Sequence, residues 1–227
     1  KLGAGTLTLT AESTYTSGTV VVAGTLVLTD PNGNDTGVVR GSLTVQTGAT
    51  VRTTANNSFG WGTARVTSLN VNEGLADNLS AGDQGWGITI NMQGGELRSN
   101  GGTNSATGSY YSLGGGSAVN VLASTNTALI TGRINLRDNT GSLPFTVADS
   151  TPAVDLLVAA ALVDAGGNTV RKLGPGVMKL TGTNTYTGGT IIGGGVLEVD
   201  LIADSVESRI GTAGGTGNYL ALQDGVL

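Results

Sequence analysis

The sequence predicts an all-β chain folded as a parallel β-helix, a rod in which short strands stack coil upon coil. Three observations lead to this fold class. The segments 1–28 and 172–199 are near copies; Val, Leu and Ile alternate with Thr, Ser and Asn; and 39 glycines punctuate the chain. β-branched residues favour pleated, half-buried strands, and glycine supplies the left-handed backbone that tight turns need. No segment has the pattern of a long amphipathic helix.

The two copies align without a gap and are identical at 13 of 28 positions. The identities are Lys1/Lys172, Leu2/Leu173, Gly3/Gly174, Gly5/Gly176, Leu9/Leu180, Thr10/Thr181, Thr14/Thr185, Tyr15/Tyr186, Thr16/Thr187, Gly18/Gly189, Thr19/Thr190, Gly24/Gly195 and Leu26/Leu197. Three short strands are expected in the first copy, over 6–10, around Tyr15 and Thr19–Val22, and over 25–28. Their inward residues are predicted to be Leu7, Leu9, Leu26 and Leu28. Tyr15 and Tyr186 are expected to lie against a neighbouring coil. The alternation does not decide which of Val20, Val21 and Val22 faces inward.

The chain between and after the copies has the same alternating pattern. Further strands are expected within 41–54, 64–74, 88–100, 117–124, 128–138, 143–149, 153–163 and 218–227. In 153–163 the alternation places Val154, Leu156, Val158, Ala160 and Leu162 on one face. A short buried helix is the alternative there, because Ala and Leu favour helices.

These elements predict one continuous β-helix over 1–227, as a segment of a longer protein. At roughly 22 residues per coil the chain makes about ten rungs, and strands spaced by about 4.8 Å give a rod on the order of 45–50 Å long. The Gly- and Ser-rich stretches 100–117 and 211–218 are expected to project from corners of the rod. One coil cannot bury its own inward face, so each must stack on its neighbours.

The repeated pattern KLGxGxLxLTxxxTYTxGT…GxL, at Lys1–Leu26 and Lys172–Leu197, resembles the passenger-associated repeat of bacterial autotransporters and related large surface proteins. The resemblance implies a right-handed parallel β-helix that is secreted or displayed at the cell surface. It also implies a C-terminal β-barrel, outside this segment, that carries the passenger across the outer membrane. In that family the repeat is associated with export and with folding of the passenger.

The charge distribution limits the classes of partner. The net charge is −5, and the 11 Lys and Arg residues are scattered without a basic run. Nucleic acid is therefore not expected as a partner, and membrane attachment is expected only through the barrel. The chain has no His and no Cys, which excludes Ser-His-Asp and Cys-His catalysis and thiolate or imidazole metal sites within it. We predict no catalytic residue, no metal site and no cofactor.

Two acidic segments are the remaining candidates for chemistry. Some parallel β-helices act on polysaccharides with clustered carboxylates, and 198–209 holds Glu198, Asp200, Asp204 and Glu207 together with Arg209. The segment 30–35, DPNGND, offers oxygen ligands but lacks the downstream Glu of a calcium-binding loop. A solvated loop and a turn, respectively, are the simpler interpretations.

Four aromatic residues are the candidate binding residues. Trp61 and Trp86 each lie in a Gly-Trp-Gly sequence and are 25 residues apart, which is close to one coil. Their indoles are therefore expected to stack on one flank of the rod. Tyr110 and Tyr111 lie in the Gly- and Ser-rich stretch. Exposed aromatic faces bind sugars or proteins with little loss of conformational entropy; the alternative is an internal ring stack that fills a corner of the core.

The function predicted from these features is structural or adhesive. The chain is expected to be an extended rod of a secreted bacterial surface protein that mediates attachment, aggregation or self-assembly, through itself or through a protein or glycan of a host or neighbouring cell. Three alternatives stay open: a filament or sheath subunit, a stalk that displays an effector domain elsewhere, and a polysaccharide-degrading β-helix.

Overall fold

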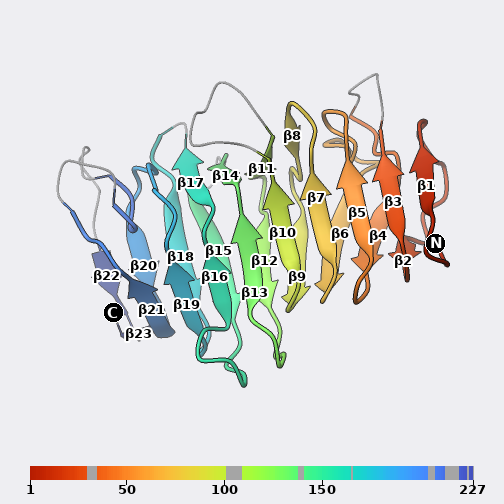
Figure 1. Cartoon of the computed structure of the whole chain (residues 1–227). Coiled ribbons are helices and arrows are strands. Elements are labelled where there is room, and N and C mark those ends of the chain that lie inside the picture. Colours follow the sequence, from red (N-terminus) through yellow and green to blue (C-terminus); the bar gives the residue numbers. More distant parts are fainter. Residues whose placement is uncertain are drawn as a thin grey trace.

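Short strands joined by glycine corners stack in parallel along one axis in a computed structural model of the chain (Figure 1). The structure describes residues 1–29, 35–100, 109–137, 141–164, 166–203, 208–212, 220–223 and 225–226. No α-helix occurs among these residues, and so none of them forms a helix able to cross a membrane. The all-β parallel β-helix predicted from the sequence is confirmed.

The strands form three sheets, and all the pairings between their strands are parallel. The first sheet has ten strands: β1 (Thr6–Leu9), β3 (Thr25–Leu28), β5 (Thr50–Thr53), β7 (Leu75–Asn78), β10 (Glu96–Ser99), β13 (Ala128–Thr131), β16 (Leu156–Val158), β19 (Val177–Leu180), β21 (Gly195–Val199) and β23 (Gly225–Val226). The second has nine: β2 (Thr19–Val21), β4 (Gly41–Val45), β6 (Val66–Asn72), β9 (Thr89–Gln93), β12 (Ala118–Val121), β15 (Ser142–Val147), β18 (Thr169–Leu173), β20 (Thr190–Ile192) and β22 (Leu220–Leu222). The third has four: β8 (Asp83–Gln84), β11 (Tyr110–Leu113), β14 (Arg133–Leu136) and β17 (Ala161–Asp164).

The coils are less uniform than the sequence prediction of about ten rungs. In the described chain, four coils contribute a strand to the third sheet. The described chain therefore has fewer than ten complete three-strand rungs. The distance in sequence between paired residues also varies, from 19 between Leu7 and Leu26 to 33 between Leu97 and Ile130. Corners of different length absorb most of this variation, and the pairing of β4 with β6 has a register shift between Gly41 and Ser42.

The core is made of columns in which each inward side chain lies over its partner in the next coil. In the first sheet Leu26, Val51, Ala76, Leu97 and Ile130 are paired in succession and are all almost fully buried. In the second sheet the corresponding column is Val21, Val45, Val71, Met92, Val121 and Val147. Aliphatic side chains of this size fill the narrow space between the sheets.

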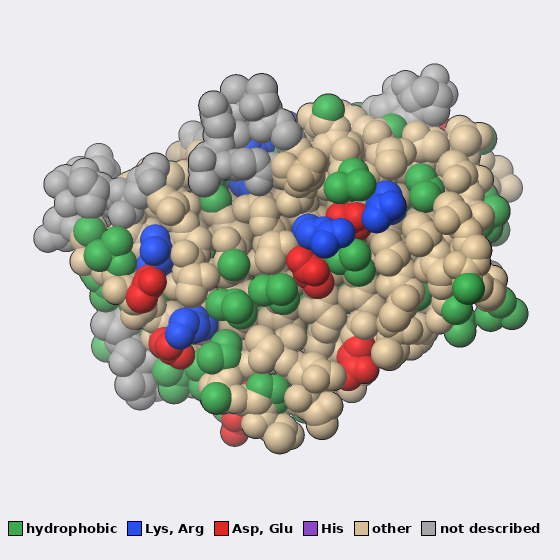
Figure 2. Space-filling model, viewed as in Figure 1, with side chains coloured by type: hydrophobic (Ala, Val, Ile, Leu, Met, Phe, Trp, Pro, Cys, Tyr) green, Lys and Arg blue, Asp and Glu red, His purple; other side chains and the backbone are tan. Residues whose placement is uncertain are grey.

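The outward faces carry polar ladders with the same register. On the second sheet, Asn91 Nδ2 donates to Asn70 Oδ1 at 2.8 Å, and Asn120 Nδ2 donates to Asn91 Oδ1 at 3.0 Å. An amide side chain donates and accepts at once, so a column of asparagines satisfies itself from coil to coil. On the face shown in Figure 2, acidic and basic side chains lie beside one another, not in a patch of one sign.

Three local expectations need adjustment. Leu7 pairs with Leu26 but is 43% exposed, because β1 is the terminal strand of its sheet. Val21 is the buried residue of its strand, and Val20 and Val22 are exposed. The stretch 153–163 is β-structure, as predicted, but it turns a corner between β16 and β17 and is not one strand.

The two copies of the repeat have the same internal geometry. Lys1 Nζ donates to Gly3 O at 2.5 Å and to Ala23 O at 2.7 Å; Lys172 Nζ donates to the equivalent Gly174 O at 2.8 Å and Gly194 O at 2.9 Å. The lysine therefore ties the glycine corners of two successive coils together. Lys172 is fully buried and also donates to Leu173 O, so its three N–H groups are all used.

Glycine is required at the second of these corners. Gly24 and Gly195 have φ of 70° and 64°. A Cβ on Gly24 would lie 2.5 Å from Ala4 O and Gly5 O, and a Cβ on Gly195 would lie 2.5 Å from Gly174 O and Gly176 O, the second of which is the counterpart of Gly5 O. The identity of Gly24 and Gly195 thus reflects backbone packing at this corner.

The repeated tyrosine also has one role in both copies. Tyr15 shares a hydrogen bond of 2.7 Å with Thr19 Oγ1, and Tyr186 shares one of 2.5 Å with Thr190 Oγ1. Tyr186 is buried, and Gly211 of the following coil packs against its ring. Burial raises the pKa of the Tyr186 phenol. Tyr15 is 42% exposed, so the expected packing against a neighbouring coil holds for Tyr186 and is incomplete for Tyr15.

Leu97→Ala tests the column of stacked core residues. Leu97 is fully buried between Ala76 and Ile130, and removing it leaves a cavity that neighbouring coils cannot close. We expect a loss of about 2–5 kcal/mol in the free energy of unfolding, measured by urea denaturation. Leu122→Ala, at a site 46% exposed, is the control and should change it by less than about 0.5 kcal/mol. Equal effects of the two changes would contradict the column.

Lys172→Met tests the buried lysine. Burial lowers the pKa of Lys172 from 10.5 to about 8. Between these pH values the unfolded chain holds a proton that the folded chain has released, so this residue makes folding more favourable as the pH rises. The variant should lack that rise when urea denaturation is compared with wild type from pH 7.5 to 9.5. It should also be less stable at pH 7 by about 1–3 kcal/mol, because three carbonyls lose their donor. Parallel pH profiles would contradict the assignment.

Candidate functional site

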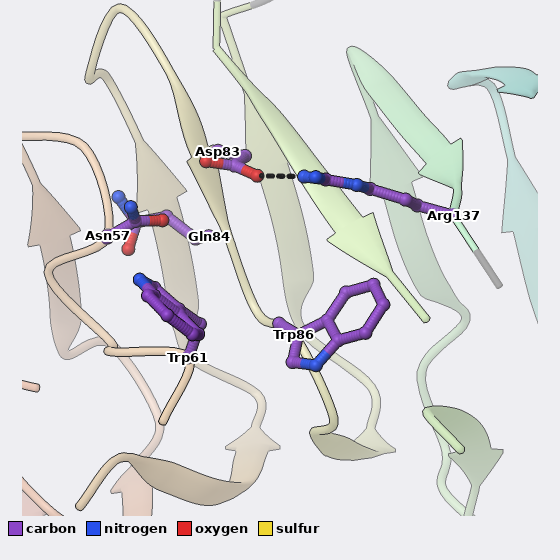
Figure 3. Close-up of a pocket in the computed structure, with 6 residues that line it drawn as sticks. All are labelled: Asn57, Trp61, Asp83, Gln84, Trp86 and Arg137. Atoms are coloured by element: carbon purple, nitrogen blue, oxygen red, sulfur yellow. Dashed lines mark hydrogen bonds and ion pairs between the residues drawn. The ribbon is translucent and has the colours of Figure 1, made fainter. Parts of the chain in front are cut away.

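The two Gly-Trp-Gly sequences form adjacent corners on one flank of the rod. Trp61 follows β5 and Trp86 follows β8 one coil later, and both side chains line one pocket of about 390 Å³. Asn57, Asp83, Gln84 and Arg137 complete its lining. In Figure 3 the indoles stand apart on one side of the pocket, and Asp83 and Arg137 meet on the other. The two tryptophans thus share a flank as predicted, with space between them and no ring stack.

One arginine joins the two tryptophan corners. Arg65 Nη1 donates to Gly62 O at 2.6 Å, and Arg65 Nη2 donates to Gly87 O at 3.2 Å. These carbonyls belong to the glycines that directly follow Trp61 and Trp86. The planar guanidinium holds the two corners at a fixed separation, which a flexible ammonium cannot do with the same geometry.

Trp86 is further held by the coil that follows. Gly87 N donates to Gly114 O at 2.9 Å, and a Cβ on Gly115 would lie 2.9–3.1 Å from three atoms of the Trp86 indole. The Arg137 guanidinium lies 5.7 Å from the centre of the Trp86 ring, within the range of a cation–π contact. Trp86 is therefore a fixed wall, and Trp61, at 51% exposed, is the open side of the pocket.

The charges that line the pocket are paired. Arg137 Nη1 lies 3.3 Å from Asp83 Oδ2, across two coils. The backbone of Asp83 is also used: its N–H donates to Asn56 Oδ1 at 2.7 Å, and its carbonyl accepts from Asn57 N at 3.0 Å. Gln84 is buried and its side chain bonds Phe59 N and Ala55 O. The pocket is thus a rigid, nearly neutral hollow with aromatic walls.

The predicted tyrosines are not part of this pocket. Both lie in the strand β11, whereas the sequence had suggested a loop. In this strand Tyr110 pairs with Asp83 and Tyr111 pairs with Gln84. Tyr111 is 1% exposed and donates to Ala76 O at 3.2 Å, so it belongs to the core. Burial raises the pKa of Tyr111. Tyr111 therefore fills the core, which was the alternative expectation for the four aromatic residues. It is withdrawn as a surface binding residue.

Tyr110 is half-buried beneath a cation. The Arg133 guanidinium lies 4.3 Å from the centre of the Tyr110 ring. Burial, together with the nearby Asp83 carboxylate, raises the pKa of Tyr110, and burial lowers that of Arg133. One face of Tyr110 is thus occupied by Arg133, which leaves Trp61 and Trp86 as the accessible aromatic pair.

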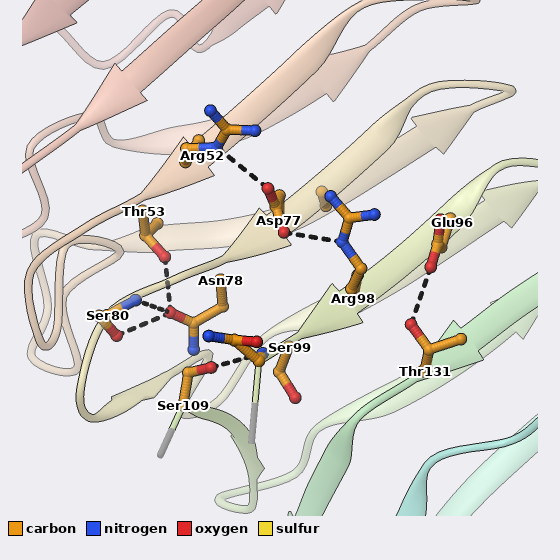
Figure 4. A network of polar contacts seen from close by, with 12 residues as sticks. Arg52, Thr53, Asp77, Asn78, Ser80, Glu96, Arg98, Ser99, Ser109 and Thr131 are labelled. Carbon is orange, nitrogen blue, oxygen red and sulfur yellow. Dashed lines mark hydrogen bonds and ion pairs between the residues drawn. The ribbon is translucent and has the colours of Figure 1, made fainter. Parts of the chain in front are cut away.

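The most buried ion pair of the described chain lies elsewhere and is structural. Asp77 is covered by two arginines from neighbouring coils, Arg52 at 3.0 Å and Arg98 at 2.9 Å (Figure 4). The three are paired in register across β5, β7 and β10. Beside them Asn78 Oδ1 accepts from Thr53, from the Ser80 backbone and from the Ser80 hydroxyl. These polar groups bond one another, so among the described residues they leave no open binding site.

The acidic candidates are also paired or lie outside the described residues. Glu198 pairs with Lys179, and Asp200 with Arg209 at 2.8 Å. Asp204 and Glu207 lie outside the described residues, as does most of 30–35; Asp35 O accepts hydrogen bonds from Trp61 N and Gly62 N. Within the described chain no group of three or more carboxylate, His or Cys side chains is placed to hold a metal ion.

The comparisons with known proteins agree with the repeat geometry. The model of the passenger-associated-transport-repeat family matches residues 1–28 and 170–199. These are the segments whose lysine, tyrosine and glycine contacts coincide, and the resemblance predicted from their sequence is confirmed. The chain therefore carries two such repeats and fits an autotransporter passenger. No curated protein and no solved structure matches the chain.

Gly115→Ala tests the packing of Trp86. The new methyl group would press on the indole, so we expect Trp86 to move, with a changed near-ultraviolet circular dichroism spectrum. Gly116→Ala is a matched control: its φ of 85° imposes at least the same backbone strain as the 61° of Gly115, but nothing lies within 4 Å of its Cβ. Identical spectra for the two variants would contradict the contact.

Proposed function

We propose that the chain is a rod segment of a secreted or surface-displayed bacterial protein, and that the rod mediates attachment or association of cells. The observation that carries the proposal is the pair of passenger-associated transport repeats, at residues 1–28 and 170–199, within one solenoid. In this role the rod is a scaffold, and its partners are a second copy of the chain or a protein or glycan of a neighbouring or host cell.

The arrangement of groups supports a scaffold over an enzyme. The carboxylates that the sequence offered for catalysis, Glu198 and Asp200, each face a basic side chain in a surface ion pair. The outward polar groups of the sheets form ladders, as with Asn70, Asn91 and Asn120. Contacts of this kind stabilise stacking, and a long stack extends a binding surface away from its point of attachment.

Display of the chain on a bacterium that does not aggregate tests this function. We expect cells that display it to sediment faster, or to bind more strongly to a layer of host cells, than cells that display a β-solenoid of equal length with a different outer surface. Settling in mixed cultures of displaying and bare cells separates self-association from binding to another cell surface. No difference from the control solenoid in either assay would overturn the proposal.

A further inference from the structure

We propose that the pocket between Trp61 and Trp86 is a binding subsite for an uncharged saccharide, and that Arg65 is the positioning residue that sets its width. This inference names the ligand class of the attachment proposed above and rests on that function. It goes further in assigning the contact to one flank of the rod and to side chains from three of its coils.

The aromatic walls favour a sugar ring. A pyranose presents a face of C–H groups and a rim of hydroxyls, so it packs its apolar face on an indole and turns its rim toward polar groups. The pocket supplies both parts: Trp61 and Trp86 on one side, and the Asp83–Arg137 pair, 3.3 Å apart, on the other (Figure 3). Its volume of about 390 Å³ is within the range of small-molecule sites.

The charges favour an uncharged ligand. Asp83 and Arg137 neutralise each other inside the pocket, and the chain as a whole has a net charge of −5, which repels acidic polysaccharides at long range. An anionic sugar that bound here would have to break the pair and take Arg137 from Asp83. Hydroxyl groups can instead donate to the carboxylate and accept from the guanidinium without separating them.

The backbone disfavours an extended peptide. A peptide strand would bind by adding to β8, the edge strand of the third sheet. The segment before it already occupies that edge, because Asn56 Oδ1 accepts from Asp83 N and Asn57 N donates to Asp83 O. A ligand must therefore be bound by side chains and not by backbone hydrogen bonds, and a saccharide can bind in this way.

Arg65 makes the two walls one site. It bonds the carbonyls of Gly62 and Gly87, next to the two tryptophans, and a Cβ on Gly87 would lie 2.8 Å from its Nη2. A lysine ammonium at this position lacks the planar fork of the guanidinium, so it would not hold the two carbonyls at the spacing that Nη1 and Nη2 set. The spacing of the indoles, and hence the size of the sugar ring accepted, is set by this bridge.

Tryptophan fluorescence offers a direct test, because the chain contains two tryptophans and both line the pocket. The purified chain is titrated with uncharged trisaccharides of glucose, N-acetylglucosamine, mannose and galactose, with sialylated and sulfated trisaccharides, and with a proline-rich decapeptide. Calorimetry then repeats the titrations on Trp61→Ala, Trp86→Ala, Arg65→Lys and the control Tyr15→Ala, which removes an exposed aromatic residue of the first coil.

We expect at least one uncharged trisaccharide to shift the fluorescence and to bind at least about tenfold more weakly to Trp61→Ala and Trp86→Ala, with Tyr15→Ala unchanged. Arg65→Lys should weaken binding several-fold and alter the near-ultraviolet circular dichroism of the tryptophans, with the far-ultraviolet spectrum kept. Lack of binding by every uncharged sugar, binding that survives both tryptophan changes, or preference for the charged sugars or the peptide would overturn the proposal. If cells displaying the tryptophan variants still attach, the saccharide subsite fails and the proposed attachment function stands.

Discussion

Every feature of this molecule depends on the register between successive coils. A coil of short strands exposes both of its edges and cannot bury its inward face alone, so its backbone and its apolar side chains must both be matched by the next coil. The columns from Leu26 to Ile130 and from Val21 to Val147 show this matching. A shift by one residue would turn an entire column to solvent, and the outward ladders of asparagines and of Arg52, Asp77 and Arg98 would lose their partners as well.

The corners keep that register while the coils change length. In the repeat, a lysine ties the glycine corners of two successive coils, and a tyrosine bonds a threonine four residues on. These contacts fix how one coil lies on the next and how the chain turns within a coil. Lys172 performs this role with its charge buried, which burial alone disfavours and three carbonyls compensate.

Alternation and the two near copies were enough to predict the parallel β-helix, the inward Leu26 and Leu28 and the β-structure within 153–163. They did not predict β8 and β11 of the third sheet, because β8 has two residues and β11 lies in a Gly- and Ser-rich stretch. The spacing of 25 residues between Trp61 and Trp86 indicated that they share a flank. The ion pair between Arg137 and Asp83, 54 positions apart, could not be predicted, because the corners between them differ in length. The adjacent tyrosines misled because a strand sends neighbours to opposite faces: Tyr110 lies under Arg133, and Tyr111 enters the core.

The location of the aromatic pocket follows from the different roles of inward, outward and corner positions in a coil. Side chains at inward positions pack in the core, and side chains at outward strand positions form ladders between coils. A substitution at either kind of position therefore affects adjacent coils. The corner segments are the part of each coil that varies in length, and side chains there can be exchanged while the register is kept. Two corners stacked one coil apart place Trp61 beside Trp86 by the geometry of the solenoid itself, and Arg65 fixes the distance between them.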